Sequence, residues 1–108
     1  MTEVHPYEIL DAADAYLVEH GWCQGHLYDD QGRACLMGAL CAAYQQASQR
    51  GCTPQSFSRA NVAVREQIRI ILGGPLTFPD YNDIVAESEA DIHTLLAEAS
   101  RYAKERWA

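Results

Sequence analysis

Four stretches of the chain repeat apolar residues at intervals of three and four positions, the spacing of an amphipathic helix. The first stretch begins at Pro6 and ends before Gly21, with proline at the helix start and glycine just past the end. Its apolar positions are Ile9, Leu10, Ala13, Tyr16 and Leu17. This pattern predicts a helix that buries one face and leaves its carboxylates in water.

The second helix is predicted from Arg33 or Ala34 to Arg50, with Gly51 as the residue that ends it. The residues from 34 to 43 are apolar almost all round, which is typical of a central helix. Gly38 and Ala39 leave a shallow surface in its interior. Because glycine costs about 1 kcal/mol in a helix, this position indicates that another backbone packs close to it.

A third helix is predicted to open at Thr53-Pro54 or Ser56 and to end at Gly73-Gly74-Pro75. Its apolar stripe comprises Phe57, Ala60, Val64, Ile68, Ile71 and Leu72, with Ile70 off the stripe. The fourth helix is predicted to be capped by Ser88 and to carry acids in its first turn. Its buried stripe comprises Ile92, Leu95, Leu96, Ala99, Tyr102 or Ala103, and Trp107.

Two connecting segments lack helical periodicity. The segment Trp22 to Gly32 contains the turn Asp29-Asp30-Gln31-Gly32 and is expected to hold a short extended pair around residues 25–28. The segment from Phe78 to Asp83 is expected to be a structured loop leading into a short helical turn, with Asp80 as its cap. The predicted fold is therefore all-α: a single domain over residues 1–108, built as a small irregular bundle of four main helices with a long loop after helix one.

Composition supports a folded, soluble domain. The chain has 108 residues, of which 48% are hydrophobic, so a core is possible without a disulfide or structural metal. No apolar run reaches the length of a membrane span, and the first residues carry acids where a secretion signal carries basic charge. We therefore expect a cytoplasmic protein without membrane association.

Charge is unevenly distributed. Residues 1–30 hold seven acids and no Lys or Arg, residues 31–79 hold five Arg and one Glu, and residues 80–108 hold seven acids and three bases, for a net charge of −7. An acidic chain repels the phosphate backbone, which argues against general nucleic-acid binding. We expect the acidic first and last helices to lie against a more basic central helix; a basic partner is the alternative.

Three short motifs carry a resemblance. They are Gly21-Trp22-x-x-Gly25, then Asp30-x-Gly32-x-x-Cys35-Leu36-x-Gly38-Ala39-Leu40, and finally Tyr81-Asn82-Asp83. Together they resemble an uncharacterised family of small actinobacterial and actinobacteriophage proteins, which pairs a G-x-x-C-x-x-G-A-L helix with a later W-N-D or Y-N-D. The resemblance implies an origin and a shape but no chemistry.

Candidate chemistry is confined to a few residues. We expect reduced thiols and no cofactor, but His20, Cys23, His26 and Cys35 are ligand types that zinc accepts. A thiol-dependent alternative makes Cys35 a nucleophile at a helix N-terminus, with His26 or His93 as base and Asn82 or Asp83 as orienting group. Two groups of oxygen ligands could bind a divalent cation: Asp29 with Asp30, and Asp80 with Asn82 and Asp83. Turn and cap roles are favoured for both groups.

The residues Asn82 and Asp83 are expected to hydrogen-bond the segment of residues 22–32 and to fix the loops around the Gly38 notch. With no catalytic set evident, the favoured interpretation is a non-enzymatic protein-binding module, a phage-encoded or accessory modulator of a bacterial host protein, and a homodimer is a further option. Its predicted contact residues are Trp22, Gln24, Leu27, Tyr28, Tyr81, Asn82 and Asp83.

Three weaker alternatives remain open. Residues 24–28, Gln-Gly-His-Leu-Tyr, resemble the short peptide by which bacterial proteins dock on the replication sliding clamp, although Leu27 and Tyr28 are expected to cover the core. Tyr44, Ile70 and Trp107 are additional candidate contact residues. A small-ligand sponge in the Gly38 notch would require a pocket.

Overall fold

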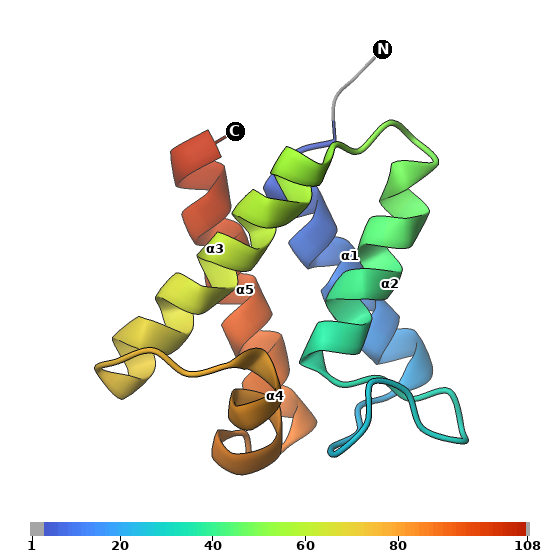
Figure 1. Ribbon diagram of the computed structural model, residues 1–108, viewed down its shortest axis with the longest axis vertical. Helices are drawn as coiled ribbons and strands as arrows, with labels where there is room; N and C mark the ends of the chain where they lie inside the picture. Colours follow the sequence, from blue (N-terminus) through green and yellow to red (C-terminus); the bar gives the residue numbers. More distant parts are fainter. Residues whose placement is uncertain (1–3, 108) are drawn as a thin grey trace.

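The computed structural model describes residues 4–107, and within them every regular element is helical. The four main helices are α1 (Pro6–His20), α2 (Leu36–Ser48), α3 (Pro54–Leu72) and α5 (Glu89–Trp107). Between α3 and α5 lie the single turn α4 (Phe78–Asp80) and the π-helix η1 (Tyr81–Val85). The all-α fold class is thus confirmed, and the short turn near residue 82 consists of two consecutive short elements, α4 and η1 (Figure 1).

The helix ends follow the local chemistry of the sequence. Helix α1 begins at Pro6, where Glu8 accepts a 2.7 Å hydrogen bond from the backbone N–H of His5. Helix α3 begins after Thr53, whose hydroxyl accepts the backbone N–H of Ser56 at 3.1 Å. It ends at Gly73, which adopts the left-handed conformation with φ +74°. These boundaries agree with the sequence prediction.

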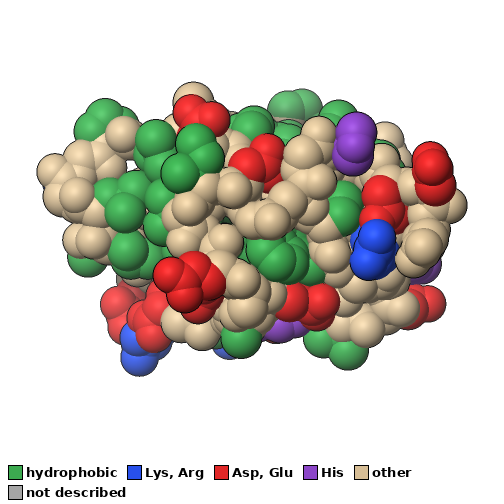
Figure 2. Space-filling view, turned by 90° about the horizontal axis from the view of Figure 1, so that it is seen from below, with side chains coloured by type: hydrophobic (Ala, Val, Ile, Leu, Met, Phe, Trp, Pro, Cys, Tyr) green, Lys and Arg blue, Asp and Glu red, His purple; other side chains and the backbone are tan. Residues whose placement is uncertain are grey.

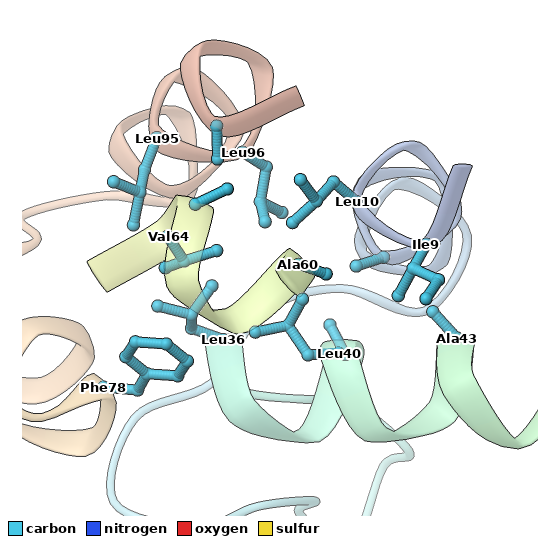
Figure 3. Packing of buried hydrophobic residues seen from close by; sticks show 14 of the residues in the cluster. Ile9, Leu10, Leu36, Leu40, Ala43, Ala60, Val64, Phe78, Leu95 and Leu96 are labelled. Atoms are coloured by element: carbon cyan, nitrogen blue, oxygen red, sulfur yellow. The ribbon is translucent and has the colours of Figure 1, made fainter. Parts of the chain in front are cut away.

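Four helices share one hydrophobic core (Figure 3). Helix α1 packs against α5 and α2, and α3 crosses α5 on the other side, so α1 and α5 form the centre of the bundle. Ile9 and Leu10 of α1 meet Leu40 of α2 and Leu96 of α5 around this centre. Phe78 of α4 closes the edge of the core next to α2. The molecule is flat, with extents of 39 × 34 × 18 Å.

Several details differ from the sequence prediction. Helix α2 begins at Leu36 rather than at residue 33 or 34, because Cys35 is its cap. Ile71 and Leu72 are 54% and 41% exposed, so the buried stripe of α3 ends at Ile68. The last turn of α3 extends past α5 (Figure 1), and its apolar side chains are exposed.

The connecting segments differ in two further ways. Thr77 rather than Asp80 caps the turn after α3, since its hydroxyl accepts the backbone N–H of Asp80 at 3.2 Å. The extended contacts of the first segment involve Ala34, which forms isolated bridges with Trp22 and Tyr28, rather than a pair within residues 25–28.

The acidic helices α1 and α5 both lie against the arginine-bearing α3, as expected, and they also pack directly on each other. His93 of α5 sits between Asp14 of α1 and Glu89, with one ring nitrogen on each carboxylate. A cation in this position offsets the repulsion between two acidic helices.

Candidate functional site

The side chain of Asn82 is fully buried in η1 and uses all of its hydrogen-bonding capacity. Its Oδ1 accepts the indole Nε1–H of Trp22 at 2.7 Å and the backbone N–H of Leu36 at 3.0 Å. Its Nδ2 donates to the carbonyl of Cys23 at 3.1 Å and to Oδ1 of Asp83 at 2.9 Å. One amide therefore joins η1, the segment after α1 and the first residue of α2.

The bond to Leu36 satisfies one of the backbone N–H groups that a helix leaves without an internal partner at its N-terminus. The adjacent N–H of Cys35 donates to the carbonyl of Leu27 at 3.1 Å. The Cys35 thiol in turn accepts the N–H of Gly38 at 3.3 Å. The start of α2 is thus capped by three separate groups, two of them distant in sequence, and Cys35 has a structural role there.

Gly38 is the position at which the loop touches α2. A Cβ atom placed on Gly38 would lie 2.3 Å from the carbonyl oxygen of Leu27, closer than real Cβ contacts allow. The hydroxyl of Tyr28 donates to the carbonyl of Gly38 at 2.9 Å. The prediction that another backbone packs against this glycine is confirmed, and that backbone belongs to residues 27–28.

Gln24 fastens the loop to η1 at a second point. Its Nε2 donates to the carbonyls of Asn82 at 3.0 Å, Asp83 at 3.4 Å and Ala86 at 3.3 Å. The carbonyls near the end of the π-helix therefore converge on one side-chain amide. In a clamp-binding peptide this glutamine must reach the partner, whereas here its amide nitrogen is occupied within the chain.

Asp83 forms the third fastening, and it stays ionised. Its Oδ1 accepts the backbone N–H of Gly25 at 3.0 Å in addition to the Asn82 amide. These two hydrogen bonds, with a smaller effect from His26, hold the pKa of Asp83 below its usual value. The expected contacts of Asn82 and Asp83 with the segment of residues 22–32 are confirmed.

The turn at Asp29 has its own support. Asp29 accepts the backbone N–H groups of Gln31 at 3.0 Å and Arg33 at 2.9 Å, and its carboxylate pairs with the Arg33 guanidinium. These contacts lower the pKa of Asp29. The carboxylate therefore stabilises the turn, as the favoured interpretation holds.

The hydrogen bonds of Gln24, Asn82 and Asp83 form a framework that joins the loop, η1 and the start of α2. Apolar side chains are exposed on this framework. Leu27, Tyr28 and Ile84 are 53%, 43% and 76% exposed. Leu27 lines a pocket of about 130 Å³, whose other lining residues are Gly25, His26, Cys35, Pro79 and Asp83. We call the exposed residues Gln24, His26, Leu27, Tyr28, Asp83 and Ile84 the loop–η1 face. Figure 2 views this end of the molecule and shows hydrophobic side chains interspersed with carboxylates.

The predicted contact residues divide into two groups in the structure. Tyr81 and Asn82 are buried and Trp22 is half-buried, so these three support the framework, whereas Gln24, Leu27, Tyr28 and Asp83 retain exposed surface. Leu27 and Tyr28 were expected to cover the core, and for Leu27 this expectation is wrong, because its backbone packs on α2 while its side chain is 53% exposed. The ring of Tyr28 lies against Gly38 of α2 and remains 43% exposed. Ile84, the most exposed large apolar residue, was missed, although its place beside the Tyr81-Asn82-Asp83 motif was a signal.

Three of the candidate metal ligands, Cys23, His26 and Cys35, lie in the same region but are not arranged as a metal site. Within residues 4–107 no group of three or more His, Cys, Asp or Glu side chains has the geometry to hold a metal ion. The thiol of Cys23 lies 3.4 Å from the carbonyl of Arg33 and 3.5 Å from that of His26. Burial raises its pKa, with the Asp29 carboxylate adding to the effect. Both features favour the protonated thiol over a metal-binding thiolate.

The thiol-dependent alternative retains one geometric element. Cys35 and His26 line the same pocket as Asp83, whereas His93 is engaged by Asp14 and Glu89 between α1 and α5. However, Cys35 is only 5% exposed, and its sulfur is occupied by the N–H of Gly38. Cys35 is therefore a helix cap that lies at the base of a pocket.

Comparison with known proteins adds a family but no activity. No curated protein and no solved structure gives a significant match to the chain. No helix within residues 4–107 combines the length and apolar character needed to cross a membrane. A family model covers residues 1–102, which includes every residue of the framework and of the loop–η1 face. The chain belongs to this family, which is described as a family of unknown function, DUF6197.

Proposed function

We propose that this protein is a non-enzymatic binding module that docks on another protein through the loop–η1 face. The observation that carries the proposal is the exposure of Leu27, Tyr28 and Ile84 on a framework held by buried and half-buried hydrogen bonds. Single exposed apolar residues are ordinary, but Leu27 lines a pocket and Ile84 adjoins Asp83 of the pocket wall, an arrangement typical of an interaction site.

The framework supports this proposal through preorganisation. A binding loop that is ordered before it meets its partner loses little conformational entropy on association. Here the loop is fixed at Asn82, Asp83 and Gly38, so its exposed side chains are already in place. A buried hydrogen-bond network with apolar side chains exposed above it is the arrangement expected of a rigid docking surface.

The size of the pocket argues for a protein partner over a small molecule at this position. Sites for drug-sized ligands usually enclose roughly 300–1,000 Å³, whereas this pocket holds about 130 Å³. It accommodates one side chain of a partner. The resemblance to small actinobacterial and actinobacteriophage proteins makes a bacterial host protein a suitable candidate, with the chain acting as its modulator.

Site-specific photo-cross-linking in native cells tests the proposal. A photoreactive phenylalanine analogue replaces Leu27 or Ile84 in turn, and replaces Val18 on α1 as the control, because Val18 is 72% exposed and lies outside the face. We expect a discrete adduct from positions 27 and 84 that position 18 does not give. An adduct of twice the chain mass would identify a second copy as the partner. If all three positions give the same adducts, or none, the proposal is wrong.

A further inference from the structure

We infer that the partner segment is basic, with an aliphatic side chain that enters the pocket at Pro79 and Lys or Arg side chains beside it. This inference rests on the proposed docking function and specifies the chemistry of the partner. It follows from the charges that border the pocket, which differ from those around the exposed apolar residues at the end of α3.

Carboxylates surround the loop–η1 face. Asp83 lines the pocket itself, Asp80 follows Pro79 on the pocket wall, and Asp30 borders a neighbouring hollow that shares His26. All three carboxylates are exposed. The acid that has a basic partner here is Asp29, which is paired with Arg33.

These charges are not neutralised within the described chain. No Lys or Arg of residues 4–107 forms an ion pair with Asp30, Asp80 or Asp83. Asp83 is stabilised as an anion chiefly by neutral N–H donors, so its negative charge persists at the surface. Unpaired charges of one sign around an apolar pocket steer and select a partner of the opposite sign.

The second exposed apolar group provides the contrast. Ile70 and Ile71 at the end of α3 lie near a hollow lined by Arg65 and Arg69, of which Arg69 is paired with Glu66. That surface has mixed charge. The two exposed apolar groups therefore differ in charge, and a basic segment fits the loop–η1 face better than the end of α3.

Selection from a library of random short peptides on phage provides the probe. Peptides are selected on the immobilised protein and counter-selected on the variant Leu27→Asp/Ile84→Asp, so that only peptides requiring the face are kept. We expect the retained sequences to carry Lys or Arg on both sides of an aliphatic residue. Their binding should weaken as NaCl is raised from about 50 mM to about 500 mM, because salt screens exposed charges.

A charge-matched pair of variants locates the effect. Asp30→Asn/Asp80→Asn removes two carboxylates from the face, and Glu98→Gln/Glu105→Gln removes two from α5 with the same change in net charge. We expect the first variant to bind a selected peptide about three- to tenfold more weakly, the range of two exposed ion pairs. The second variant should bind it as the natural chain does.

The outcomes separate this inference from the proposed function. Peptides that require Leu27 and Ile84 but carry no excess of Lys or Arg would overturn the basic partner and leave the docking face intact. Equal losses in the two charge variants would also overturn it, since net charge alone would then explain binding. If no peptide requires Leu27 and Ile84, both the inference and the docking proposal fail.

Discussion

The indole of Trp22 and the amide of Asn82 form a hydrogen bond of 2.7 Å across 60 positions of sequence. The same Asn82 oxygen caps α2 through Leu36, so the tryptophan and the helix depend on one atom. In the motif Tyr81-Asn82-Asp83, Asn82 is therefore a structural residue. Its neighbours Asp83 and Ile84 reach the surface.

Replacing Asn82 should be strongly destabilising. Asn82→Ala leaves the Leu36 N–H and the Cys23 carbonyl without their partner in the interior, and each buried unsatisfied group costs about 1–3 kcal/mol. We expect a loss of about 3 kcal/mol in the free energy of unfolding, measured by urea denaturation. Trp22 fluorescence should shift to the red in the folded variant.

Asn61 provides the control for this prediction. Its amide donates to the carbonyl of Phe57 within α3 at 2.8 Å, a bond that no other element depends on. Asn61→Ala should change stability by less than about 1 kcal/mol. Equal losses of unfolding free energy in Asn82→Ala and Asn61→Ala would show that the Asn82 network stabilises the fold no more than the single bond of Asn61 does.

Gly38→Ala should destabilise the protein although alanine is the better helix former. The added Cβ would meet the backbone oxygen of Leu27, so the whole segment of residues 22–34 must move. Overpacking of this kind costs about 1–3 kcal/mol, more than the ~1 kcal/mol gained in helix propensity. Thermal unfolding measures the net effect.

Gly74 provides the control for Gly38→Ala, because a Cβ atom placed on Gly74 meets nothing within 4 Å. Gly74→Ala should leave the melting temperature unchanged or raise it slightly. A Gly38→Ala variant as stable as Gly74→Ala would contradict the close packing of the loop on α2.

The sequence predicted the helices well and the site only in part. Periodicity and caps are local signals, which is why the bounds of α1 and α3 agree with the prediction. Gly38 was informative because an interior glycine has a cost that only close packing explains. The burial of Asn82 and the outward turn of Leu27 depend on contacts some 60 and 10 positions away, and residue type does not reveal such contacts.

Stability should depend on pH through His93. A neutral imidazole carries one N–H, so only the imidazolium can donate to both Asp14 and Glu89. Hydrogen bonds to these carboxylates raise its pKa, the Asp14 bond most. The contribution of His93 to the free energy of unfolding is therefore complete below about pH 6.5, the pKa of histidine in the unfolded chain. It is lost as the pH rises through the higher pKa that His93 has in the folded protein.

Unfolding free energies measured across this pH range test the assignment. The natural chain should lose about 0.5–1 kcal/mol between pH 6 and 9 from this group, a size typical of partly exposed pairs. His93→Gln should remove that part of the slope, and Asp14→Asn should reduce it. A slope that is unchanged in His93→Gln would place the titration elsewhere.

Thiol reactivity distinguishes a cap from a nucleophile. Cys41 is partly exposed, whereas Cys23 and Cys35 are buried. Burial raises the pKa of Cys41 and of Cys23, which slows the alkylation of both thiols. With iodoacetamide under native conditions, we expect peptide mass spectrometry to find Cys41 modified before Cys35. Preferential modification of Cys35 would instead support the thiol-dependent alternative.

The separation in sequence between η1 and its partners sets an order of events in folding. Residues 22–36 obtain their fixed geometry from Asn82 and Asp83, which lie 46 to 60 positions further along the chain. Contacts at this range close large loops, so they form after local helical structure. Local bonds such as those of Asp29 and Cys35 can order parts of the segment early, and the docking of η1 completes its fixed geometry. In amide hydrogen exchange, Gly25 and Leu36 should open together with η1, as one cooperative unit, rather than with α1 and α2 on either side.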